Sequence, residues 1–491
     1  MPLSLPAPLL PFGNLLRTSA RDLLQVDAPL WVTRAPGCLD AVGGPGEAFG
    51  SASITVATTR AVFSGIQNRE DDKIFIRFIR PKSHGGDQEW SGVLSDIYTK
   101  KGPPRSLAVL RDMFETADAP WMMKMMATMI GLRRTHQLNT PKVGFVLIVW
   151  DNLPDIPGMG GREAVSVSTA MAFKASTGLD IKRVDGIRVA RAVSYGEKEV
   201  FGVSLPMTKT LTCALAQPGT VLHIEHGLDP KMHWVPLPDQ SQMVAIDTGF
   251  GVAVPEQDRA AAEAGAAMGL EHLNKALKAA KEDEVGGWGM IAPSKFEGGL
   301  RNHVPTKENG REWLKKFPKV DELVREAVDS EHGYRERALS EHQCREAGRA
   351  RRLVLHFSEH ARTKREELLA ESGRVLNSSH RSLREKCSIT HDGVAAFQKK
   401  ITDVGRKGGL FGSRMAEAGE SSIVLVFAHA TGPLRVRELA AEFAKEANTR
   451  CQVFPCNGQG GVLSGWWEGI LEPPAPPKKV EPDDAEESAK A

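Results

Sequence analysis

The sequence predicts an α+β protein with two lobes, because strand patterns and helix patterns come in blocks and do not alternate regularly. Alternating apolar residues indicate strands at residues 54–58 and 74–79, and a continuous apolar run indicates another at 143–149. Helical patterns follow at 164–176 and 186–201. A chain of 491 residues is long enough for one large two-lobed domain.

The bulk composition is that of an ordinary globular protein. The chain has 63 Lys and Arg residues against 61 Asp and Glu residues, so its net charge is +2. This balance does not indicate a nucleic-acid or membrane surface, and no apolar run approaches the roughly 20 residues of a transmembrane helix. The six cysteines contain no Cys-x-x-Cys pair, which favours reduced thiols and a cytoplasmic protein.

Changes in composition divide the chain into segments. Residues 1–27 are rich in Leu and Pro and predict a loose leader, after which a first lobe is expected over 28–215. A second lobe is expected over 216–470, with an irregular, partly Gly-rich insertion at about 285–345. Residues 471–491 contain Pro, Lys, Asp and Glu with almost no large apolar side chains, and predict a disordered tail.

The first candidate site segment begins at residue 35 and reads Ala-Pro-Gly-Cys-Leu-Asp, followed by a Gly-Gly pair and an acidic residue. Its carboxylates, Asp40 and Glu47, can accept hydrogen bonds from hydroxyl groups. Cys38 supplies no positive charge.

The second segment follows a predicted strand, opens a predicted helix, and is rich in glycine. Backbone N–H groups at such a helix start can hold a phosphate, and Gly158, Gly160 and Gly161 leave room for one. Arg162 can pair with a phosphate directly, whereas Glu163 would repel it unless a metal ion lay between them.

Two further segments complete the pattern. Residues 202–212 contain Lys209, which is cationic at neutral pH and therefore a poor general base. Residues 376–384 read Leu-Asn-Ser-Ser-His-Arg-Ser-Leu-Arg, and residues 412–422 open with Gly-Ser-Arg-Met and contain Gly419 between two glutamates.

In their order and spacing, these segments resemble the GHMP kinase superfamily, on the galactokinase and L-arabinokinase side. The resemblance extends from Trp31 to about Gly465. It implies a two-lobed GHMP-kinase fold, with an N-terminal ribosomal S5-like lobe and a C-terminal ferredoxin-like lobe. The family transfers a phosphoryl group from ATP, with Mg²⁺, to a monosaccharide and forms a sugar 1-phosphate.

The resemblance also assigns roles to the candidate residues. Cys38 stands where the family has an arginine that steadies phosphoryl transfer, and Lys209 stands where it has a catalytic aspartate. Sugar contacts fall on Asp40 and Glu47. The nucleotide-binding positions are Gly158, Gly160, Gly161, Arg162, Glu163 and Gly419, and the serines of the family's phosphate loop are absent there.

These replacements leave two functions open. The chain is a sugar kinase homologue with weak or lost catalysis, binding a monosaccharide and ATP, or it is a non-catalytic pseudokinase that acts as a sugar or nucleotide sensor or as a partner subunit. Loss of the arginine and of the base would each raise the barrier by several kcal/mol.

One short motif suggests a competing metal site. His356 and His360 belong to a His-x-x-Glu-His sequence, and on a helix both imidazoles would lie on one face, as zinc requires. A charged helix that packs its apolar stem against the domain explains the same residues. No metal is expected here.

Overall fold

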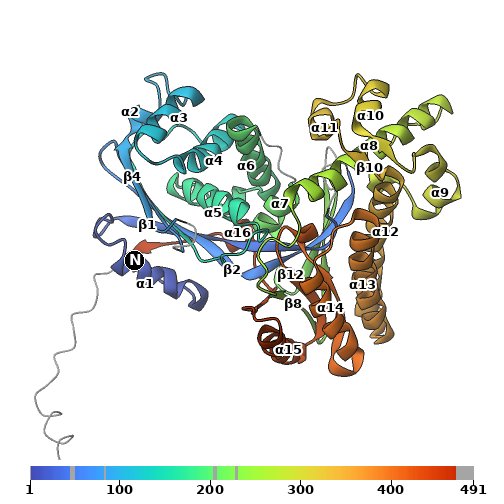
Figure 1. Ribbon diagram of the computed structural model, residues 1–491. Helices are drawn as coiled ribbons and strands as arrows, with labels where there is room; N and C mark the ends of the chain where they lie inside the picture. Colours follow the sequence, from blue (N-terminus) through green and yellow to red (C-terminus); the bar gives the residue numbers. More distant parts are fainter. Residues whose placement is uncertain (1, 45–49, 82–84, 203–206, 227–229, 472–491) are drawn as a thin grey trace, which may run out of the picture.

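The computed structural model describes residues 2–44, 50–81, 85–202, 207–226 and 230–471. Within these ranges the chain forms an eight-stranded sheet, a four-stranded sheet and a two-stranded sheet, with helices packed around them (Figure 1). The predicted α+β class is confirmed.

The first sheet has the strand order β14-β1-β2-β5-β3-β4, and β6 and β7 extend it from the start of β2. Neighbouring strands are antiparallel, except for the parallel pair β3 and β5. The strands predicted at 54–58 and 74–79 lie in β2 and β3, and the one predicted at 143–149 corresponds to β5, which begins and ends two residues later. The bounds are β1 (Pro29–Val42), β2 (Ala52–Asn68), β3 (Lys73–Ile79), β4 (Gln88–Val93), β5 (Phe145–Asp151), β6 (Thr220–Glu225), β7 (Lys231–Pro236) and β14 (Trp466–Ile470).

Helices cover one face of this sheet, where Figure 1 shows α4, α5 and α6 together. A run of methionines on α4 is buried, and these flexible side chains fill the space between helices and sheet. The predicted helix at 186–201 is confirmed. The bounds are α2 (Leu94–Ile97), α3 (Leu107–Thr116), α4 (Met122–Arg134), α5 (Gly161–Ser176), α6 (Gly186–Phe201) and α7 (Met207–Leu215).

The expectation of a loose leader over residues 1–27 is wrong for its central part. A short 3-10 turn leads into helix α1 (Leu10–Thr18), whose Phe12 is fully buried. The ring of Phe12 stacks on that of Trp150 in the first sheet, with centroids 6.1 Å apart. Proline is tolerated in the first turn of a helix, so Pro11 marks the start of α1 instead of interrupting it.

The second sheet has the order β13-β8-β12-β11 and is antiparallel throughout. In chain order these are the fourth, first, third and second strands, which is the arrangement of a ferredoxin-like lobe. Helices α14 and α15 accompany it in the lower part of Figure 1. The bounds are β8 (Ser241–Asp247), β11 (Leu410–Met415), β12 (Ile423–His429), β13 (Gln452–Pro455), α14 (Asp392–Val404) and α15 (Gly432–Glu446).

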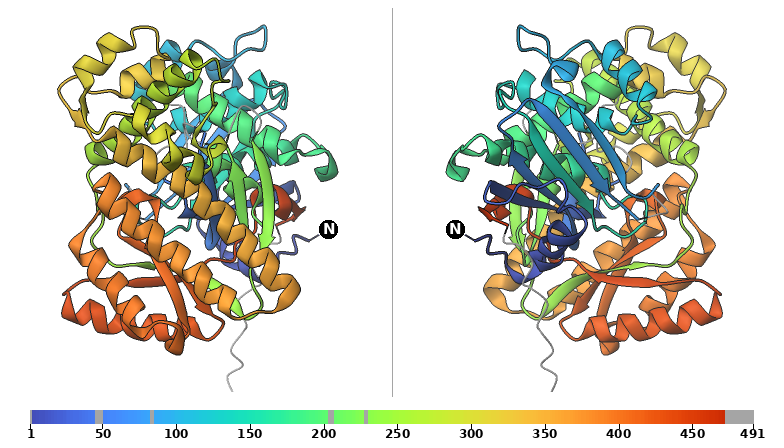
Figure 2. Two further views of the ribbon diagram at one scale, coloured as in Figure 1. Left: turned by 90° about the vertical axis from the view of Figure 1, so that its right-hand side faces the viewer. Right: turned by 90° about the vertical axis from the view of Figure 1, so that its left-hand side faces the viewer.

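Three long helices and a small insertion complete the molecule. Helices α12 and α13 pack against each other, and the left view of Figure 2 shows them in front. The insertion packs against α8 through two small apolar clusters, one around Trp288 and one around Trp313, and both side chains are fully buried. The bounds are α8 (Glu256–Ala279), α9 (Pro293–Gly298), β9 (Glu308–Asn309), α10 (Gly310–Lys316), α11 (Glu322–Ala327), β10 (Gly333–Tyr334), α12 (Glu336–Thr363), α13 (Glu367–Cys387) and α16 (Gly461–Ser464).

The lobe boundaries stay predictions, but the first sheet draws on more of the chain than residues 28–215. Strands β6 and β7 follow residue 215, and β14 returns from the far end of the chain to pair with β1. Residues 472–491 of the predicted tail lie outside the described residues. Among those described, no helix is both long enough and apolar enough to span a bilayer.

Candidate functional site

A cleft of about 630 Å³ lies where five parts of the chain meet. These are the end of β1, the glycine-rich turn before α5, the first turns of α7 and α8, and the segment after β11. The cleft brings together eight of the residues that the sequence singled out. They are Cys38, Asp40, Gly158, Gly160, Gly161, Arg162, Glu163 and Lys209.

Two predicted positions fall elsewhere. Glu47 lies outside the described residues. Gly419 does not line the cleft. Its carbonyl instead accepts a hydrogen bond from the N–H of Val254 at 2.9 Å. A side chain at Gly419 would meet Val254 at 2.5 Å, so this glycine serves local packing.

The glycine-rich turn keeps the backbone shape of an anion cradle. Gly158 and Gly160 have φ values of 81° and 67°, which favour glycine, and Gly160 caps the start of α5. A Cβ atom at Gly160 would lie 2.6 Å from the sulfur of Cys38. The backbone N–H of Cys38 donates to the carbonyl of Met159 at 2.9 Å, which ties the turn to β1.

Acidic side chains pack against this turn. A Cβ atom at Gly158 would lie 3.2 Å from Cγ of Glu417 and 3.4 Å from Cβ of Glu420. The ammonium group of Lys209 lies 2.8 Å from a carboxylate oxygen of Glu417 and 3.0 Å from one of Glu420. The charge of Lys209 is therefore already paired, at the place where the resemblance expects a catalytic base.

The same contacts determine the charge state of Lys209. Burial acts to lower its pKa, but Glu417 and Glu420 outweigh burial and hold the pKa well above its usual range. Burial raises the pKa of Glu417, and the ammonium of Lys209, 2.8 Å away, acts in the opposite direction by stabilising the carboxylate. A lysine held in its charged form cannot accept a proton from a sugar hydroxyl.

Cys38 is a buried thiol. Its sulfur lies 3.8 Å from that of Cys213 on α7, and it donates to the backbone carbonyl of Lys209 at 3.7 Å. The hydrogen bond with Cys213, together with burial, raises the pKa of Cys38 well above its usual range. The protonated thiol is a poor nucleophile and offers no positive charge to a phosphate.

Arg162 is occupied by a contact between helices. Its guanidinium forms an ion pair with the buried carboxylate of Glu197 on α6, and it lies 4.7 Å from the ring centre of Phe201. Lys124 of α4 contacts the same carboxylate. Arg162 therefore helps to join α5 to α6, in contrast to its expected role as a phosphate ligand.

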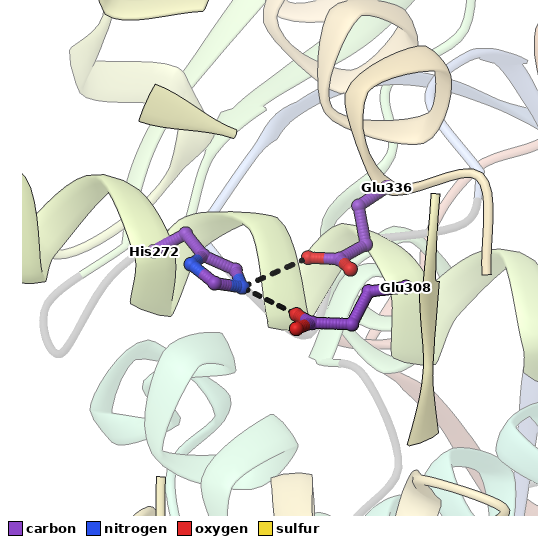
Figure 3. A group of neighbouring side chains, drawn as sticks. All are labelled: His272, Glu308 and Glu336. Carbon is purple, nitrogen blue, oxygen red and sulfur yellow. Dashed lines mark hydrogen bonds and ion pairs between the residues drawn. The ribbon is translucent and has the colours of Figure 1, made fainter. Parts of the chain in front are cut away.

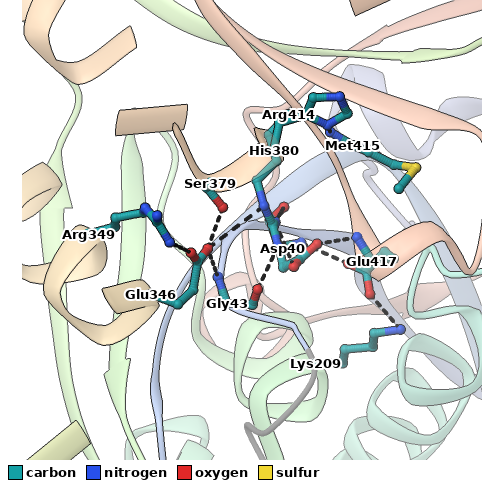
Figure 4. A network of polar contacts seen from close by, with 10 residues as sticks. All are labelled: Asp40, Gly43, Lys209, Glu346, Arg349, Ser379, His380, Arg414, Met415 and Glu417. Atoms are coloured by element: carbon teal, nitrogen blue, oxygen red, sulfur yellow. Dashed lines mark hydrogen bonds and ion pairs between the residues drawn. The ribbon is translucent and has the colours of Figure 1, made fainter. Parts of the chain in front are cut away.

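Asp40 lines the cleft, but its carboxylate is also occupied (Figure 4). One oxygen accepts from Nη1 of the fully buried Arg414 at 2.7 Å, and the other accepts from the backbone N–H of Glu417. Arg414 also donates to the carbonyl of Gly43 at 2.5 Å. Asp40 thus connects β1 to β11, where the resemblance expected a free sugar ligand.

Glu346 of α12 extends this network to the long helices. Its carboxylate accepts from Arg349 at 2.7 Å, from the N–H of Gly43 at 3.2 Å, and from the hydroxyl of Ser379 on α13. The sequence offered no signal for Glu346, which lies within a charged helical pattern. Arg414, in contrast, belongs to the intact Gly-Ser-Arg-Met segment, and that motif indicated its importance in the sequence.

His380 belongs to the same region and is neutral. Its Nδ1 accepts a hydrogen bond from the N–H of Met415 at 3.3 Å, an assignment that requires an unprotonated nitrogen. Burial lowers the pKa of His380 to about 4, and nearby Arg414 acts in the same direction.

We therefore expect His380 to remain neutral at pH 5.5 in NMR spectra of its imidazole nitrogens, with His380→Gln identifying the signal. As the pH falls, the imidazole of His380 takes up a proton in the unfolded chain before it does so in the folded protein. The folded state therefore loses stability between about pH 6.5 and pH 4. Relative to His380→Gln, the wild type should lose up to about 1.4 kcal/mol per pH unit in that window. Equal pH dependence of the two proteins would contradict this assignment.

The charge of the cleft does not suit a triphosphate. Seven acidic side chains line it against three basic ones, and Lys209 and Arg162 are already paired. Helix α8 adds Glu256, Arg259 and Glu263, which the sequence did not indicate because they continue an ordinary helical pattern. The acidic residues are Asp40, Asp151, Glu163, Glu256, Glu263, Glu417 and Glu420.

The resemblance implies ATP and Mg²⁺, and the side chains of the cleft fit the two differently. Carboxylates such as Glu163 and Glu420 are oxygen ligands of the kind that Mg²⁺ accepts. Within the described ranges, however, no three such groups converge in the cleft. The triphosphate itself does not fit, because Glu417 and Glu420 lie against the turn that would hold it.

Comparison with known proteins supports the fold. No protein-family model and no curated protein matches the sequence. Galactokinase from Lactococcus lactis, solved with galactose, aligns with a TM-score of 0.66 at 14% identity and covers 91% of this chain and 98% of its own. The Lin0012 protein from Listeria innocua aligns with a TM-score of 0.50 at 10% identity, over 87% of this chain and 97% of its own.

Sequence identities this low establish the fold and not the activity. The galactokinase alignment covers 91% of this chain, so the similarity concerns the fold of nearly the whole chain. The chain has the two-lobed fold of the GHMP kinases.

Proposed function

We propose that this protein is a sugar kinase homologue that binds a monosaccharide and has lost most or all phosphoryl transfer. The observation that carries the proposal is the contact of Glu417 and Glu420 with the glycine-rich turn, where both also pair with Lys209. Two carboxylates occupy the position from which a kinase would hold phosphate.

Electrostatics favours a neutral ligand over a nucleotide. Two like charges 4 Å apart repel by about 4 kcal/mol at the effective dielectric constant of a protein surface. A triphosphate would meet several such charges at once. A sugar carries no charge, and its hydroxyl groups can donate to the carboxylates that line the cleft.

An active kinase is the second candidate, and the glycine-rich turn favours it. Gly158 and Gly160 keep their positive φ values, and the start of α5 still faces the cleft. Activity would require Glu417 and Glu420 to leave the turn when ATP arrives. Lys209 would then be free to contact a phosphate.

Thermal denaturation of the full chain with ligands separates the two candidates. Galactose is the first sugar to test, because the galactokinase that shares this fold was solved with it. We expect a monosaccharide to raise the melting temperature while Mg·ATP leaves it unchanged, since stabilisation follows the affinity for the folded state. A shift with Mg·ATP, followed by ADP release on adding one sugar, would establish the kinase instead.

Removal of the two charges on the turn should restore nucleotide binding. In Glu417→Gln/Glu420→Gln, each amide keeps an acceptor oxygen, but Lys209 loses both carboxylate partners. We expect the Kd for Mg·ATP, measured by calorimetry, to fall at least about tenfold, which corresponds to about 1.4 kcal/mol.

The matched control is Glu438→Gln, which removes an exposed carboxylate from α15 and should leave nucleotide binding unchanged. Glu420→Gln alone gives a milder variant, because this side chain is one third exposed. Wild-type binding of Mg·ATP that is as tight as that of the double variant would refute the role of these carboxylates.

A further inference from the structure

A cluster of metal-ligand side chains lies outside the cleft, where the insertion packs on the long helices. It consists of His272 on α8, Glu308 on β9, and Glu336 at the start of α12 (Figure 3). Along α8, His272 follows the cleft residue Glu263 by nine positions, or about 14 Å of helix. The cluster is thus separate from the candidate sugar site.

The ligand atoms already face one another. Nε2 of His272 lies 2.7 Å from an oxygen of Glu308 and 3.4 Å from an oxygen of Glu336, and all three atoms lie within 4.8 Å of one another. Ligand atoms around a tetrahedral zinc are about 3.4 Å apart, given bonds of about 2.0–2.2 Å. Small side-chain rotations are therefore enough to place an ion between them.

The carboxylate of Glu336 indicates a bound cation independently of these distances. Its side chain is 0% exposed, and neither carboxylate oxygen has a hydrogen-bond partner among the described residues. Its one ion-pair neighbour, Nε2 of His272, is 3.4 Å away and already directed to Glu308. A buried carboxylate with no partner is costly, and a cation at the centre of the cluster removes that cost.

The remaining neighbours fit a bound ion. The second oxygen of Glu308 contacts Lys316, so Glu308 can keep this ion pair while its first oxygen binds a metal. The ring of Phe317 meets that of His272 edge-on, with centroids 4.8 Å apart, and holds the imidazole in place.

We propose that His272, Glu308 and Glu336 bind one divalent transition-metal ion of the zinc and manganese class, which fastens the insertion to α8 and α12. One imidazole and two carboxylates are ligands that such ions accept. Three protein ligands leave an open position for water. The proposal does not depend on the sugar or nucleotide chemistry of the cleft.

The test uses the full chain, freed of metal with a chelator and then titrated with Zn²⁺ by calorimetry. We expect one Zn²⁺ per chain with a Kd of about 1 μM or below, and a higher melting temperature with the ion bound. Glu336→Gln and His272→Gln should each weaken binding by at least about 100-fold, or 2.7 kcal/mol.

The matched control is His356→Gln/His360→Gln, which removes the competing His-x-x-Glu-His motif on α12 and should leave Zn²⁺ binding unchanged. X-ray absorption of the zinc-loaded wild type should show one imidazole nitrogen with carboxylate oxygens, and this decides the matter if a variant fails to fold. Absence of stoichiometric binding to the wild type, loss of binding only in the control, or a site with two imidazoles would overturn the proposal. If the wild type binds no Zn²⁺, a proton on Glu336 neutralises the buried carboxylate in place of the ion.

Discussion

Arg414→Met is expected to lower the free energy of unfolding by about 3–5 kcal/mol, which is the usual loss when one partner of a buried ion pair is removed. Arg414 is fully buried and pairs with Asp40 at 2.7 Å. It also lies 3.9 Å from the buried carboxylate of Glu346. Without the guanidinium, both acids stay in the interior with less compensation. Urea denaturation measures the change.

Two further variants make this prediction specific. Arg435→Met removes an exposed arginine that pairs with Glu438 within α15, and it should leave the free energy of unfolding nearly unchanged. In Asp40→Asn/Arg414→Met the orphaned charge of Asp40 is gone, so the double variant should be more stable than the sum of the single changes predicts. A loss below about 1 kcal/mol for Arg414→Met would show that Arg414 does not hold β1 to β11.

Phe12→Ala should also cost about 3–5 kcal/mol, because the change leaves a large cavity in a packed core. Phe12 is fully buried, and its ring stacks on those of Phe63 and Trp150 at centroid distances of 5.6 and 6.1 Å. The expected signs are a lower denaturation midpoint and faster proteolytic cleavage near α1 in the native protein.

The control for Phe12 is its near neighbour Leu10, which is 49% exposed. Leu10→Ala removes a side chain of the same helix and should change the stability by less than about 0.5 kcal/mol. If the wild type loses residues 1–27 to protease without any change in its denaturation midpoint, the leader is loose, as the sequence alone predicted.

Features that follow from local patterns and from the order of segments along the chain were predictable from the sequence. Periodicity and motif order predicted the fold class, the bounds of α6 and the convergence of Cys38, Lys209 and the glycine-rich turn. These features depend on local patterns and on chain order. The prediction of a loose leader is wrong because a Leu- and Pro-rich composition does not exclude a helix, and Pro11 lies in the first turn of α1.

The use of individual side chains could not be predicted from the sequence. Arg162 and Asp40 occupy the expected places, but Glu197 and Arg414, distant in sequence, are their partners. The contact of Lys209 with Glu417 joins α7 to the segment after β11. Pairings of this kind depend on the three-dimensional approach of elements, which spacing along the chain does not encode.

The pairing of β14 with β1 bears on how the chain is made by the ribosome. Residues Pro29–Thr33 align with Trp466–Ile470, and the N–H of Leu3 donates to the carbonyl of Ile470 at 2.9 Å. During synthesis, strand β1 therefore has no partner on its outer side until more than 460 residues have been joined. An unpaired edge invites association with other chains, so a nascent or truncated chain lacking β14 is the form most exposed to aggregation.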